Sequence, residues 1–182
     1  MTREGVPPGA FLEIKWQNFK EGDEWFRARQ DHLFALKVSD SAPVIYLNEA
    51  IANARPVLDS QGTHGVKGRI RDASYFMIVH QAWSSLIASA LSHLARMYAD
   101  QSYDDRLNGL PQWEAIVLED WGPYLYPATD KGSAIDQIIE AVQNQIALDE
   151  LVTERLPTAI QTRFLTTRGF EGLVAEVLTN EI

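Results

Sequence analysis

Apolar and polar side chains alternate with a period of two near the start of the chain, between Ala10 and Leu47. Such alternation is typical of half-buried strands. The alternating apolar positions are Leu12, Ile14 and Trp16, followed by Phe34, Leu36 and Val38. Breaks at 20–23 and 39–43 indicate turns, and 44–47 adds a short apolar run. Because short turns join antiparallel partners, this region predicts an antiparallel sheet of three or four strands.

The pattern then becomes helical, and the longest helix is expected at about residues 70–99. No Asp, Glu, Lys or Arg occurs between Ala73 and Ala95. A run of this length could cross a bilayer, but His80, Gln81, His93 and five serines interrupt it. Their polar groups would lie in lipid without partners. We therefore predict a core helix that is buried on most sides, and no membrane association.

Shorter helices are predicted on both sides of the long one. The first is expected from Asn48 to about Leu58, and the second from Trp113 to a stop at Gly122-Pro123. A third begins at Ser133, and a break is expected at Leu156-Pro157. The last helix contains Leu173, Val174, Val177 and Leu178. The helix from Ser133 carries an apolar stripe at Ile135, Ile138, Ile139, Val142 and Ile146.

These elements predict an α+β fold in which the N-terminal antiparallel sheet packs on a helical layer with the long helix buried at its centre. We expect one domain over residues 1–182, a size that can hold a sizeable core. Within it, 1–9 is expected to be a mobile tail, 10–47 mainly strands and 48–182 mainly helices.

Composition and charge narrow the class of protein. There is no cysteine, and residues 1–10 lack the apolar core of a signal peptide, so we expect a cytoplasmic protein without disulfides. The net charge of −9 lies entirely in residues 73–182, which carry fifteen acids and six bases. This acidic part would repel phosphate backbones, which argues against nucleic acid as its partner. It is either a solvated surface or a docking face for a basic partner.

The most pointed local feature is the glycine-rich basic segment at residues 62–71. Its candidate anion-binding residues are Thr63, His64, Lys67, Arg69 and Arg71. Backbone amides at a helix N-terminus attract anions, and nearby bases strengthen that attraction, so the segment could hold a phosphate or a carboxylate. It is not a Walker loop, because no Ser or Thr follows its lysine directly. The alternative is a surface connection whose bases are simply solvated.

The histidines do not indicate a catalytic or metal site. His80 and His93 are thirteen residues apart on the expected helix, so they point about 140° apart. Ser89 precedes His93 by one helical turn, but the local sequence shows neither an orienting acid nor an oxyanion hole for such a couple. We therefore predict no catalytic residue, no metal and no cofactor.

Aromatic residues gather around the acidic stretch that follows the long helix. Trp113, Trp121, Tyr124 and Tyr126 are the candidate interaction residues, because Trp and Tyr are enriched in binding hot spots. Anchoring loops to the domain's own core is the alternative role for the same rings.

Two functions remain. The first is a non-enzymatic protein–protein interaction subunit of a homo-oligomer or larger intracellular assembly. The second is a ligand-binding or enzymatic domain that holds an anion at residues 62–71.

Overall fold

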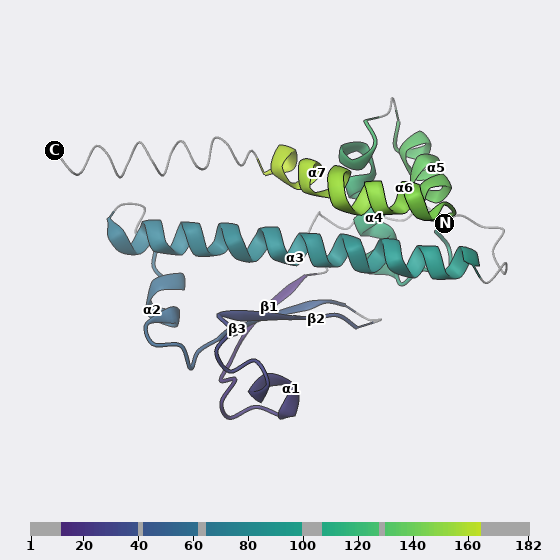
Figure 1. Cartoon of the computed structure of the whole chain (residues 1–182). Helices are drawn as coiled ribbons and strands as arrows, with labels where there is room; N and C mark the ends of the chain where they lie inside the picture. Colours follow the sequence, from purple (N-terminus) through teal and green to yellow (C-terminus); the bar gives the residue numbers. More distant parts are fainter. Residues whose placement is uncertain (1–11, 40–41, 62–64, 100–106, 128–129, 165–182) are drawn as a thin grey trace. The chain divides into compact units, whose positions relative to one another are not determined.

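The structure, a computed structural model, describes residues 12–39, 42–61, 65–99, 107–127 and 130–164 (Figure 1). The tail expected at 1–9, the residues Thr63 and His64, and the helix expected at 173–178 lie outside these ranges. Strands occur early in the chain and helices dominate the rest, so the α+β class is confirmed. The chain divides into two compact units, 1–82 and 83–182.

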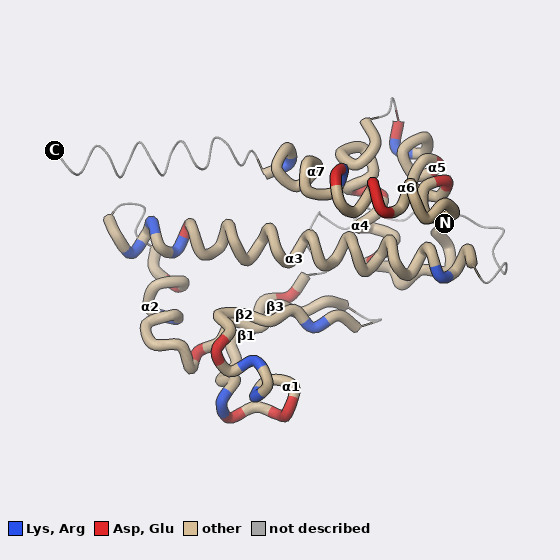
Figure 2. The backbone as a smooth tube through the Cα atoms, in the orientation of Figure 1, with Lys and Arg blue, Asp and Glu red and all other residues tan. Residues whose placement is uncertain are grey.

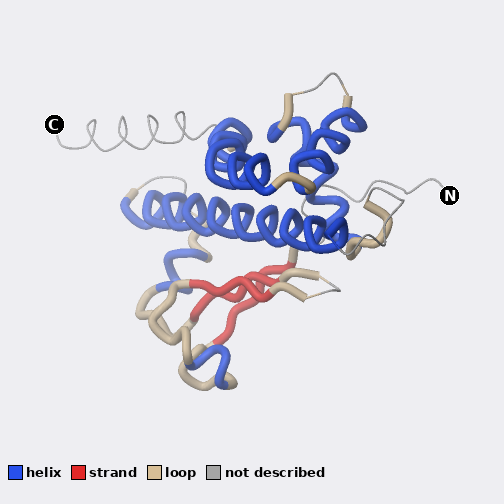
Figure 3. Tube along the Cα trace, turned by 45° about the vertical axis from the view of Figure 1, so that its right-hand side comes forward, coloured by secondary structure: helices blue, strands red, loops and turns tan. Residues whose placement is uncertain are grey.

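The first unit contains a three-stranded sheet with the order β1-β3-β2 (Figure 3). Its strands are β1 (Glu13–Gln17), β2 (Phe34–Lys37) and β3 (Val44–Asn48). β2 pairs with β3 antiparallel, whereas β1 pairs with β3 parallel, with Ile14 beside Ile45. The sheet is therefore mixed, and the expectation that all its pairings are antiparallel was wrong for β1.

The segment after β1 explains this topology. Residues 20–23 do not turn back into a hairpin, because Asp23 caps the short helix α1 (Glu24–Arg27). The Asp23 carboxylate accepts a hydrogen bond from the Phe26 amide at 3.1 Å. β2 and β3 then pair as a hairpin, which leaves β1 beside β3 in the same direction. A long connection of this kind is what parallel pairing requires.

Apolar side chains cover both faces of the sheet. On one face, Ile45 and Leu47 form a buried cluster with Leu58, Ile78 and Ala82. On the other face, Phe19 and Phe26 pack with Ala35. Leu58 belongs to α2 (Ala54–Leu58), and Ile78 and Ala82 belong to α3 (Val66–Ala99). The early turns of α3 thus complete the core of the first unit.

A short helix was expected to start at Asn48, but Asn48 ends β3 as a fully buried polar residue. Its side-chain amide donates to the carbonyls of Gln30 at 2.8 Å and His32 at 2.9 Å. Its side-chain oxygen accepts from the amides of Phe19 at 3.3 Å and Ala50 at 3.0 Å. One side chain therefore joins three loops at the end of the sheet. The helix starts only at Ala54, because these hydrogen bonds hold Asn48 at the end of the sheet.

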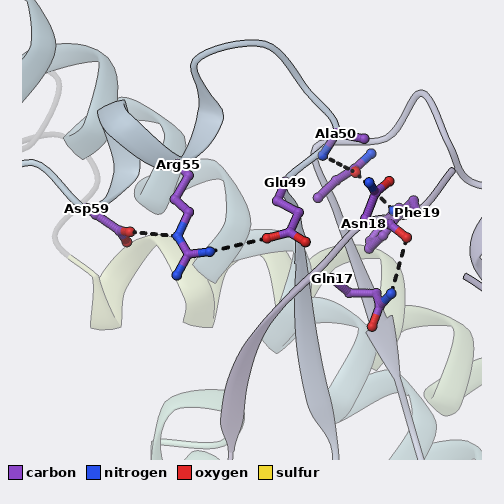
Figure 4. Close-up of polar contacts among 8 residues, drawn as sticks. Gln17, Asn18, Phe19, Glu49, Ala50, Arg55 and Asp59 are labelled. Atoms are coloured by element: carbon purple, nitrogen blue, oxygen red, sulfur yellow. Dashed lines mark hydrogen bonds and ion pairs between the residues drawn. The ribbon is translucent and has the colours of Figure 1, made fainter. Parts of the chain in front are cut away.

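Two ion pairs that share one arginine lie beside these loops, outside the core. The guanidinium of Arg55 reaches the carboxylates of Glu49 at 3.2 Å and Asp59 at 3.4 Å (Figure 4). All three side chains are exposed or nearly so, so each pair contributes about 0–1 kcal/mol.

The long helix is confirmed as α3, which has 34 residues. Several of its apolar residues are buried: Ile78, Leu86, Ile87, Leu91 and Leu94. It begins at Val66, earlier than the expected start near residue 70, so most of the glycine-rich basic segment forms its first turns. None of the helices described is long and apolar enough to cross a membrane.

The second unit is helical. After the last turns of α3 come α4 (Gln112–Leu125), α5 (Lys131–Val142), α6 (Gln145–Glu150), the π-helical turn η1 (Leu151–Arg155) and α7 (Leu156–Arg163). Gly122 of α4 packs close to α5, because a Cβ there would lie 3.4 Å from that of Ala134. The stripe expected on α5 is buried at Ile135 and Ile138, but Ile146 is 82% exposed because α5 ends before it.

Two expected helix breaks are absent. α4 continues through Gly122-Pro123 to Leu125. Pro123 lies in the last turn, and burial of Trp121 and Leu125 offsets its missing hydrogen bond. The helical path also continues through Leu156-Pro157. Here the Leu156 amide donates to the carbonyl of Leu151, five residues back, and this wider turn makes room for a ring that a regular helix would not accept.

Candidate functional site

The basic residues of the candidate anion site lie on the first turns of α3 (Figure 2). Arg71 is already engaged: it forms an ion pair with Asp72 at 2.7 Å and donates to the carbonyl of Ser60. Lys67 is exposed and Arg69 is partly buried. Within the ranges that the structure describes, neither of these two forms an ion pair. The three bases therefore do not converge on one point.

Tyr75 lies one turn further along α3 and packs against the core of the first unit. Burial raises the pKa of its hydroxyl, and Asp59 adds to this rise while Arg71 counteracts it. The hydroxyl therefore stays protonated at neutral pH. It supplies a neutral polar group near the bases and no additional charge.

A feature of α3 that the sequence analysis missed is a row of exposed apolar side chains. Val66 is 69%, Ile70 49% and Met77 43% exposed, and Ala73 between them is also exposed. At 100° per residue these four positions fall within an arc of about 60° on the helix surface. We call Val66, Ile70, Ala73 and Met77 the apolar row.

Later turns of the same helix are different. Their exposed side chains include Gln81, Ser85, Ser92 and Arg96, all of them polar. A solvated helix face is normally polar in this way. Single exposed apolar residues are common on proteins, but a contiguous set marks an interaction surface. The apolar row is therefore the part of α3 that most needs an explanation.

The four candidate aromatic residues separate into two kinds. Trp113 and Trp121 are buried in the second unit and present no ring to solvent. Tyr124 is exposed and Tyr126 is half-buried. The guanidinium of Arg155 lies 4.6 Å from the ring centre of Tyr126. Burial raises the pKa of the Tyr126 hydroxyl, which Arg155 counteracts, so it remains a neutral hydrogen-bonding group.

Arg163 at the end of α7 packs on several of these rings. Its guanidinium lies 4.4 Å from the ring centre of Trp121 and 5.0 Å from that of Tyr124. It also donates to the carbonyl of Asp120 at 3.0 Å. Because the chain's own arginine covers these rings, the arrangement is a packing cluster within the second unit. It holds α7 against α4.

His93 has an acidic partner that its local sequence does not reveal. Nδ1 of His93 lies 2.7 Å from the carboxylate of Glu114, whose side chain is only 5% exposed. The pair joins α3 to α4 across 21 residues of sequence. A carboxylate that orients an imidazole is one part of a catalytic triad, but no described hydrogen bond links Ser89 to His93. The pair serves to satisfy a buried acid.

The described residues contain no group of three His, Asp or Glu side chains that could hold a metal ion. No protein-family model, curated protein or solved structure matches the chain. The geometry of the described residues therefore carries the functional argument.

Proposed function

We propose that this chain is a non-enzymatic protein–protein interaction subunit, and that the apolar row of α3 is its docking face. The observation that supports the proposal is the exposure of Val66, Ile70 and Met77 along one side of a helix. Recognition of a helix by a partner commonly uses apolar anchors at i, i+4, i+7 and i+11, which is the spacing of the row.

The energy available from this row suits a reversible assembly. Burying a large apolar side chain completely contributes about 1.5–3 kcal/mol. The three large side chains of the row are already partly buried, so their remaining exposed area would contribute about 3 kcal/mol in total. Additional contacts around the row are needed for a stable complex, because association itself costs several kcal/mol.

The alternative function, an anion held at residues 62–71, has less support. Arg71 is occupied by Asp72 and the Ser60 carbonyl. Lys67 and Arg69 lie on different sides of α3, about 160° apart at 100° per residue. Bases that diverge in this way do not enclose one phosphate.

Site-specific photocrosslinking in cells that express the full chain tests the proposal. A photoreactive residue in place of Met77 should give discrete adducts of defined mass. The same residue in place of the exposed Ser92, on a polar part of the helix, should give none. Ile70→Ser should abolish the adducts while lowering the free energy of unfolding by only about 1 kcal/mol, because about half of the Ile70 side chain is exposed. Equal adducts at Met77 and Ser92 would refute the proposal.

A further inference from the structure

We infer that the partner of the apolar row is an acidic amphipathic helix. The inference rests on the proposed function and adds the chemistry of the partner. Two bases border the row. Lys67 lies about 90° to one side of the centre of the row and Arg69 about 70° to the other, at 100° per residue.

These two bases differ from their neighbour Arg71, because within the described residues no acid pairs with either of them. Arg71 is neutralised by Asp72 at 2.7 Å. Lys67 and Arg69 form no ion pair with any part of the chain that the structure describes. Among the described residues, no acid therefore pairs with the positive charges on the two sides of the first turn of the row, although the chain as a whole has a net charge of −9. Charge complementarity points to acidic side chains on the partner.

The dimensions of the row favour a helix as the occupant. From Val66 to Met77 the row spans about 16 Å, at 1.5 Å per residue, or three helical turns. A partner helix of about twelve residues would match this length with apolar side chains on one face. Both bases lie at the same end of the row. The matching Asp or Glu residues should therefore flank the apolar face in one terminal turn of the partner, as charged residues flank the seam of a coiled coil.

Two other occupants fit less well. A second copy of the chain, bound through the same row, would bury only four side chains from each protomer, far less than the ~800 Å² per partner of a stable interface. An anionic lipid surface attracts clusters of four or more bases, whereas this row has two, and the acidic remainder of the chain would be repelled. Both remain distinguishable outcomes of the test.

The test uses two fluorescent peptides titrated into the full chain and followed by fluorescence anisotropy. Both peptides are amphipathic helices of about sixteen residues with leucines at the spacing of the row. One carries Glu on both flanks of the leucines, and the other carries Lys at the same positions. We expect the Glu peptide to bind about tenfold more tightly, which corresponds to ~1.4 kcal/mol. This preference should shrink as salt is added.

Matched variants separate the effect of position from that of net charge. Lys67→Glu and Arg96→Glu change the net charge equally, and both residues are exposed on α3. Lys67→Glu should reduce the preference for the Glu peptide to about threefold or less, in line with the loss of one exposed ion pair. Arg96→Glu should leave the preference within about twofold. Equal effects of the two variants would overturn the inference, because the preference would then follow overall charge.

The remaining outcomes distinguish this inference from the proposed function. If both peptides bind equally and Ile70→Ser abolishes both, the docking face stands and the acidic partner is wrong. If neither peptide binds but the crosslinks at Met77 appear, only the inference fails, and if the crosslinks are also absent, both proposals fail. Binding to phosphatidylserine vesicles but to neither peptide would show that the occupant is a lipid surface and not an acidic helix. A dimer that is seen in light scattering and that Ile70→Ser dissociates would show that the occupant is a second copy of the chain.

Discussion

Replacing Asn48 should destabilise the first unit more than any surface change, because this one side chain satisfies four backbone groups. In Asn48→Ala the carbonyls of Gln30 and His32 lose their donor, and the amides of Phe19 and Ala50 lose their acceptor. A hydrogen bond contributes about 0.5–1.5 kcal/mol net. Four bonds therefore predict a loss of about 3 kcal/mol in the free energy of unfolding, allowing for water reaching some of the loop groups.

Asn48→Asp tests the two hydrogen bonds that the side chain donates separately from the two that it accepts. The aspartate keeps an oxygen for the amides of Phe19 and Ala50, but it places a second oxygen against the carbonyls of Gln30 and His32. A buried carboxylate facing two carbonyls is repelled and poorly solvated. We therefore expect Asn48→Asp to be at least as destabilising as Asn48→Ala at neutral pH, although Asp and Asn have nearly the same shape.

Urea unfolding followed by tryptophan fluorescence measures both variants. With a slope of about 2 kcal/mol/M, a loss of 3 kcal/mol lowers the midpoint by about 1.5 M. The control is Asn108→Ala, at an exposed asparagine, which should change stability by less than about 0.5 kcal/mol. Wild-type stability in Asn48→Asp would refute the reasoning, because it would mean that the two donated hydrogen bonds are unimportant.

Three further predictions follow from other contacts. His93→Ala removes a partner 2.7 Å from the buried carboxylate of Glu114 and should cost about 1–3 kcal/mol in thermal or urea unfolding; a neutral effect would show that other groups satisfy this acid. Burial lowers the pKa of His80 from its ordinary value of 6.5, so the unfolded chain takes up the proton first and stability falls as the pH drops below about 6.5. His80→Phe should reduce this fall between pH about 7.5 and 5.5, and an unchanged pH profile would contradict it. Gly22→Ala places a Cβ 2.6 Å from that of Phe26 and should destabilise by about 1–3 kcal/mol, whereas Gly65→Ala, with open space around it but φ +89°, tests the separate effect of backbone strain.

The sequence predicted the elements better than their arrangement. Alternation with a period of two located the strands, and the uncharged run located α3, because both patterns report which face of a local element is apolar. The direction of β1 depends on how the chain returns after Asp23. After Asp23 the chain forms the helix α1 and not a hairpin, because Phe26 packs against Phe19 and Ala35. The local sequence pattern does not reveal these contacts.

Proline was the least reliable signal. Pro123 and Pro157 were both expected to end helices, and both lie within helical segments. The local rule is sound, since each lacks an amide hydrogen. It was overridden by tertiary burial in α4 and by a wider turn before Pro157, and neither effect can be recognised from the neighbouring residues alone.

Of the candidate docking face, only the basic residues could be predicted from the sequence. The bases at 67, 69 and 71 stand out in the sequence, but the apolar row does not, because an exposed apolar face and a core face have the same spacing. Whether Ile70 and Met77 are covered depends on where the sheet contacts α3. Likewise, Glu114 could not be assigned to His93 before the fold placed the two side chains together.

The π-helical turn η1 lets the helical path from α6 to α7 hold one extra residue. A π turn holds one residue more than the α-helical turn it replaces. Deleting one residue between Leu151 and Arg155 would therefore close the wide turn but leave the angular position of α7 nearly unchanged, so Arg163 would still face the rings of Trp121 and Tyr124. What the deletion would remove is the room for the Pro157 ring, which a regular helix does not accept. A chain that is one residue shorter here should therefore be destabilised unless Pro157 is replaced as well.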